Sequence, residues 1–170
     1  PQWGKQHVPT RHTCSQKVGD LAILWSKVCT GIGHQGVVLS IIIRASYESE
    51  GISFLTPDDF PQQVGYMKRE RDYVIPPHVH NAVERKIYDT QEVLLIRSGK
   101  VRVDYYDNNK IYLESRVLSA GDVILLAYGG HGFVMLEDSE IIEVKQGPYV
   151  GDNDKTRFSP VDNHKVRIGR

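Results

Sequence analysis

The stretch Tyr73–Lys100, YVIPPHVHNAVERKIYDTQEVLLIRSGK, decides how the chain is interpreted, and its centre is the triplet His78-Val79-His80. In an extended strand the side chains of residues i and i+2 point to the same face, so the two imidazoles would project together. Two neutral imidazoles on one face form half of a typical metal site. We therefore expect further ligands elsewhere in the chain.

The sequence around this stretch predicts an all-β protein. From residue 37 onward, short apolar segments rich in β-branched residues alternate with turn residues such as Ser98-Gly99 and Ala120-Gly121. No amphipathic helix of ten or more residues is predicted. Val101, Val103 and Tyr105 share one face of a predicted strand and Arg102 and Asp104 share the other, which is typical of a wall with one wet side. Many short strands with frequent turns favour an antiparallel sandwich or barrel.

Length and composition narrow the classes of function. A chain of 170 residues is expected to form one domain. The formal net charge is zero, which argues against a broad nucleic-acid or acidic-membrane surface and favours a small molecule as the partner. No apolar run is long enough to span a bilayer and the first residues lack the apolar core of a signal peptide, so we expect a cytoplasmic protein. Cys14 and Cys29 show no CxxC spacing and are expected to be free thiols, although a single disulfide stays open.

Two further ligand-type residues fall on predicted strands. Glu92 shares a strand face with Leu94 and Ile96, and Gly99 is expected to close a hairpin into the next strand. His131 follows a glycine-rich turn at the start of another strand, where its same-face neighbours are Phe133 and Met135. Three histidines and one carboxylate on strands would converge inside a barrel and leave metal positions open.

These residues resemble the two motifs of the cupin family. His78, His80, Glu92 and Gly99 match the first motif, G(X)5HXH(X)3–4E(X)6G, and the second, G(X)5PXG(X)2H(X)3N, is met by Gly121, Gly129 and His131. The resemblance covers roughly residues 62–146, about half of the chain.

The sequence also departs from the cupin pattern. Asp72 stands where the first motif has glycine, and a longer loop, NAVERKIYDT, precedes Glu92. Glu84 lies at the usual short spacing after His80, but Glu92 is preferred because Gly99 follows it at the motif distance. In the second motif Ala127 replaces proline, His131 comes one residue early and Met135 replaces asparagine.

The resemblance implies a cupin-type antiparallel β-barrel, also described as a double-stranded β-helix or jelly roll. We expect an N-terminal extension over residues 1–35, the barrel over residues 36–150 and a C-terminal tail over residues 151–170. It also implies a homodimer and one divalent metal, iron, manganese, nickel, cobalt or zinc, held by His78, His80, Glu92 and His131.

Glu143 and Lys145 are the candidate catalytic residues, because they share one face of a predicted strand. If that face looks inward, the pair would orient a substrate or transfer a proton; if it looks outward, it is an ordinary solvated pair, and the sequence slightly favours the outward arrangement. The first functional hypothesis is a metal-dependent isomerase or epimerase acting on a small polar molecule such as a sugar. The alternatives are an iron-dependent dioxygenase and a non-catalytic binding or sensing protein.

Overall fold

The structure is a computed structural model that describes residues 29–169, except for the side chains of Cys29, Asp152 and Asn153. Its sheets are antiparallel, and the only helices of the described chain are two short 3-10 turns, η1 (Gly151–Asp154) and η2 (Asn163–Lys165). No helix within these residues is long and apolar enough to cross a membrane. The described residues fall into two compact units: a smaller unit of residues 48–87 and a larger unit of residues 29–47 and 88–169.

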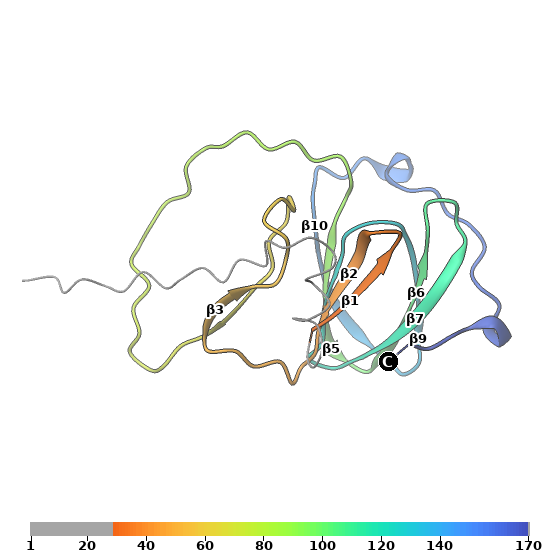
Figure 1. Ribbon diagram of the computed structural model, residues 1–170, viewed down its shortest axis with the longest axis horizontal. Coiled ribbons are helices and arrows are strands. Elements are labelled where there is room, and N and C mark those ends of the chain that lie inside the picture. The colour runs from red at the N-terminus through yellow and green to blue at the C-terminus, as the bar shows by residue number, and fades with distance from the viewer. Residues whose placement is uncertain (1–28, 170) are drawn as a thin grey trace, which may run out of the picture. The chain divides into compact units, whose positions relative to one another are not determined.

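The larger unit contains two antiparallel sheets (Figure 1). The five-stranded sheet has the order β1 (Cys29–His34), β2 (Val37–Ile43), β8 (Val123–Leu126), β5 (Glu92–Ser98) and β10 (Glu140–Lys145). The three-stranded sheet has the order β7 (Tyr112–Ser119), β6 (Lys100–Tyr106) and β9 (Gly130–Met135). The expected all-β fold of antiparallel sheets is thus confirmed, and the described strands of this unit form two sheets that are not joined into a closed barrel. Residues 29–34, expected in the N-terminal extension, form the edge strand β1.

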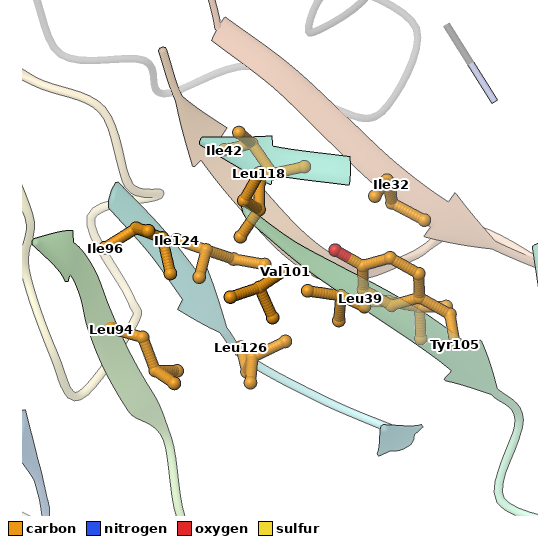
Figure 2. Packing of buried hydrophobic residues seen from close by; sticks show 11 residues of the cluster. Ile32, Leu39, Ile42, Leu94, Ile96, Val101, Tyr105, Leu118, Ile124 and Leu126 are labelled. Carbon is orange, nitrogen blue, oxygen red and sulfur yellow. The ribbon is translucent and has the colours of Figure 1, made fainter. Parts of the chain in front are cut away.

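The apolar core of the larger unit includes residues from both sheets (Figure 2). Ile42 on β2, Ile124 on β8 and Leu94 on β5 occupy paired positions across the five-stranded sheet, so they share one face. Val101 and Tyr105 on β6 belong to the same buried cluster. The alternation of β6 that the sequence shows therefore places Val101 and Tyr105 in the core, as expected.

The other face of β6 is buried as well, which corrects the expectation of a wet side. Arg102 and Asp104 are 9% and 2% exposed and form an ion pair at 2.8 Å. The C-terminal segment packs against them: Asn163 accepts hydrogen bonds from Arg102, and Ile168 forms a parallel bridge to Ser115 on β7. A strand face with polar side chains is exposed to solvent only when no other segment of the chain covers it. Here the C-terminal segment covers it and hydrogen-bonds with its side chains.

Gly99 does not close a hairpin. β5 pairs with β8 and β10, whereas β6 pairs with β7 and β9, so the chain passes from one sheet to the other at Gly99. Gly99 has a φ of 79°, and a Cβ on it would lie 2.2 Å from the carbonyl oxygen of Asp138. Glycine is required there by both the left-handed backbone and the close approach.

The smaller unit contains a two-stranded antiparallel sheet of β3 (Gly51–Phe54) and β4 (Gly65–Lys68). Residues 73–88, which follow β4 along the chain, are exposed and form neither helix nor strand. The expected strand over residues 73–80 is therefore wrong. Pro76 and Pro77 explain the failure, because two successive prolines remove the backbone N–H groups that a sheet ladder needs.

Candidate functional site in the larger unit

Glu92 and His131 meet across the two sheets of the larger unit. Glu92 is the first residue of β5 and shares the core face with Leu94, whereas His131 is the second residue of β9 and is paired in register with Tyr105. The Nε2 of His131 lies 3.1 Å from Oε2 of Glu92. The side chain of Glu92 is 15% exposed and that of His131 is 28% exposed, so solvent still reaches the pair.

The electrostatics of the pair favour an ionised carboxylate. The hydrogen bond from His131 lowers the pKa of Glu92 below its ordinary value and outweighs the opposing effect of burial. The positive charges of Lys145 and Lys155 add to this lowering. Glu92 therefore stays charged at neutral pH and can accept a hydrogen bond from a bound molecule.

Both residues line a cavity of about 920 Å³ that lies within the larger unit. This volume lies within the range of roughly 300–1,000 Å³ that is usual for sites of small molecules. Apolar walls come from Leu126 and Phe133, and the Phe133 ring lies 5.4 Å from the His131 ring. The other lining residues include aromatic, hydroxyl and charged side chains: Tyr88, Asp89, Thr90, Asp104, Tyr106, Asn108, Tyr128, Glu143, Asp154, Lys155, Thr156, Arg157 and Phe158.

Glu143 lies on the cavity face of β10, which corrects the slight preference for an outward arrangement. It pairs in register with the buried Leu94, and Lys145 pairs with Glu92, so both residues share the core face of their sheet. Glu143 lines the cavity directly, whereas Lys145 lies beside it with Nζ 3.4 Å from Oε1 of Glu143. For Lys145, desolvation lowers the pKa, but the neighbouring carboxylates, Glu143 first, raise it above its ordinary value. Alternation along β10 did not show which of its two faces points to the cavity, because the face opposite Glu143 and Lys145 is also apolar.

The C-terminal segment supplies a wall of the cavity that the sequence did not predict. Lys155, Arg157 and Phe158 line the cavity, although this segment was expected to be a tail that packs back only in part. The Phe158 ring packs edge-on against Tyr106 with 5.0 Å between centroids. The available signal was the dense run of charged and aromatic residues after Gly151, but nothing local indicates that it returns to the strand ends.

His78 and His80 lie in the smaller unit, among the exposed residues 73–87. Their rings are 5.3 Å apart, and the Nδ1 of His78 hydrogen-bonds with the carbonyl oxygen of Pro76. Glu84, the alternative carboxylate, lies in the same exposed segment. The structure thus brings Glu92 and His131 together and describes the two other histidines in a separate unit.

The predicted metal set can be tested against these positions. Among residues 29–169, no group of three or more His, Cys, Asp or Glu side chains is placed to hold a metal ion. Glu92 and His131 alone provide two donors of the kind that divalent transition metals accept. Both of these residues belong to the larger unit, and the four-ligand centre of His78, His80, Glu92 and His131 stays a prediction from the sequence.

Comparisons of the chain with protein-family models, with curated proteins and with solved structures gave no match. The site is therefore interpreted from its own residues.

Proposed function

We propose that the larger unit binds a small polar molecule, such as a sugar or sugar derivative, in its cavity and transfers protons on it. The observation that carries this proposal is the contact between Glu92 and His131 at the cavity wall. A carboxylate and an imidazole in hydrogen-bond contact are a common pair for general acid–base chemistry. The reaction class that fits is isomerisation or epimerisation, in which a proton leaves one carbon and returns to the same or a neighbouring carbon.

Each charged side chain then has a role. The ionised Glu92 removes the proton from a carbon next to a carbonyl, and His131 donates a hydrogen bond to the oxygen on which negative charge develops. Glu143 reaches the cavity and is held by Lys145, so it is placed to bind a hydroxyl group of the substrate. No oxidant or reductant is needed, because the proton that leaves is balanced by the proton that returns.

The resemblance to cupins supports the same proposal at the level of the fold. Two facing antiparallel sheets with ligand-type residues at the strand ends are what a cupin-type barrel requires. A homodimer belongs to this proposal, and sedimentation of a monomer at micromolar concentration would contradict it.

The divalent metal has a separate test, since His78 and His80 belong to the smaller unit. Elemental analysis of protein purified without added metal is expected to find iron, manganese, nickel, cobalt or zinc, in an amount that falls in His78→Ala. Iron together with substrate-dependent oxygen uptake would favour the dioxygenase alternative. Absence of metal, with an unchanged melting temperature of His78→Ala under added metal, would contradict the four-ligand centre.

Proton transfer can be measured directly with a panel of aldoses and ketoses in deuterated water. We expect the wild-type protein to exchange the hydrogen on the carbon next to the carbonyl for deuterium, seen as loss of its proton NMR signal. His131→Asn and Glu92→Gln should slow this exchange by about a hundredfold or more, the usual contribution of a general acid or base.

His164→Asn is the matched control for this experiment. His164 forms another histidine–carboxylate contact, with Asp162 at 2.8 Å, but it is exposed and does not line the cavity. Exchange should therefore be unchanged in His164→Asn. Equal exchange rates in His131→Asn and His164→Asn would contradict the role of His131 in proton transfer. Binding of a sugar without exchange would favour the non-catalytic alternative.

A further inference from the structure

The C-terminal segment over residues 154–158 is held firmly against the cavity. The Phe158 ring contacts Tyr106, and the backbone N–H of Val161 donates a hydrogen bond of 2.9 Å to the Tyr106 hydroxyl. A side chain on Gly130 would meet the Phe158 ring at 3.1 Å, so the segment lies close to β9 at this point. These contacts fix where the side chains of Lys155 and Arg157 can reach.

Three carboxylates around the cavity already contact basic side chains. Glu92 contacts His131, Glu143 contacts Lys145, and Asp154 lies 3.9 Å from the same lysine. Lys155 also lines the cavity, and it forms no ion pair with any acidic side chain that the structure describes. An incoming anion would therefore find at the wall a cation that is paired with none of the described carboxylates.

We infer that Lys155, with Arg157 beside it, binds an anionic group of the ligand, a phosphate or a carboxylate. This inference rests on the proposed function, since the remainder of the ligand lies against Glu92 and His131. The ligand class becomes a small hydroxylated molecule that carries one acidic group, such as a sugar phosphate or a sugar acid. Arginine and lysine are the usual partners of both groups, and arginine can contact two of their oxygens at once.

The position of the cations also restricts how such a ligand lies. The acidic group faces the C-terminal segment, and its repulsion from the carboxylates of Glu92 and Glu143 keeps it away from the strand ends. The hydroxylated part of the molecule then lies against Glu92 and His131. A neutral sugar would lack this orientation and would bind more weakly.

Calorimetric titration with three probes, glucose, glucose 6-phosphate and glucuronate, tests the inference. We expect at least one of the two anions to bind the wild-type protein about tenfold tighter than glucose, the gain from one charge-assisted hydrogen bond. Lys155→Gln should remove most of this preference. Comparison of the two anions decides between phosphate and carboxylate.

Lys165→Gln is the matched control, because Lys165 is exposed on the same C-terminal segment and does not line the cavity. It should keep the preference for the anion, and circular dichroism should show all variants folded. Equal affinities for all three probes, unaltered in Lys155→Gln and Arg157→Gln, would overturn the inference. The proposed function would survive that result if His131→Asn still weakened glucose binding, whereas no binding of any probe at millimolar concentration would overturn both.

Discussion

Ser40 and Tyr105 form a polar contact inside an otherwise apolar core. Ser40 on β2 belongs to the five-stranded sheet and Tyr105 on β6 to the three-stranded sheet, and the serine hydroxyl donates a hydrogen bond of 2.9 Å to the phenol oxygen. Both residues are almost fully buried. The contact thus joins the two sheets at a point where water cannot replace a lost partner.

We predict that removal of both partners destabilises the protein less than the sum of the two single removals. Tyr105→Phe and Ser40→Ala should each lower the free energy of unfolding by about 1–3 kcal/mol, because each leaves a buried hydroxyl unpaired. The double variant should recover part of the summed loss. Urea unfolding of the four proteins measures the coupling, and strictly additive losses would contradict it.

The same phenol gives stability a dependence on alkaline pH. Burial raises the pKa of Tyr105 well above its ordinary value, and the hydrogen bond from Ser40 only partly opposes this. Because the folded pKa exceeds the unfolded pKa, the contribution of Tyr105 is fully present below about pH 10 and is lost as the pH rises further. In the urea experiments this loss at alkaline pH should be smaller in Tyr105→Phe than in the wild type.

At the scale of the elements, the passage of the chain between the sheets depends on Gly99. Gly36, in the turn between β1 and β2, has a similar φ of 81°, but a Cβ there would meet nothing within 4 Å. The two glycines therefore separate the cost of a left-handed backbone from the cost of a steric clash.

We predict that Gly36→Ala lowers the free energy of unfolding by about 1–2 kcal/mol, the cost of a left-handed residue. Gly99→Ala should cost at least about 1–3 kcal/mol more, since its Cβ would collide with the backbone of Asp138. Chemical unfolding of both variants measures the difference. Equal losses would mean that the backbone around Asp138 moves aside at no cost.

At the scale of the whole larger unit, the C-terminal segment covers one face of the three-stranded sheet. The side-chain oxygen of Asn163 accepts a hydrogen bond from Arg102, and the backbone N–H of Val161 donates one to the Tyr106 hydroxyl. The backbone N–H of Ser115 donates a further one to the carbonyl oxygen of Arg167. Without it, the buried pair of Arg102 and Asp104 would face water.

A chain that ends at Val150 should lose about 3 kcal/mol or more of unfolding free energy, roughly 1 kcal/mol for each hydrogen bond. Asn163→Ala, which removes only the two hydrogen bonds from Arg102, is the graded control and should lose about 1–2 kcal/mol. Thermal unfolding of both proteins measures whether the truncated chain loses more stability than Asn163→Ala. Equal melting temperatures of the truncated and full chains would contradict a structural role of the segment.

The sequence predicted the features that depend on local pattern. Alternation along β6 identified Val101, Val103 and Tyr105 as core residues, and glycine-rich turns placed His131 at the start of a strand. Glu92 was expected on the face of Leu94, and it lies there. Side-chain period and turn chemistry are local properties, so they can be read without knowledge of strand pairing.

What the sequence alone determined is therefore an antiparallel β protein with Glu92 and His131 on inward-facing strand positions. Only the tertiary structure decided which strands pair across Gly99, that Glu143 faces the cavity, and that Lys155 returns to its wall. It also replaced the expected strand around His78 with an irregular exposed segment. The physical reason is that these features depend on contacts between residues far apart in the chain, where burial and shared hydrogen bonds outweigh local preference.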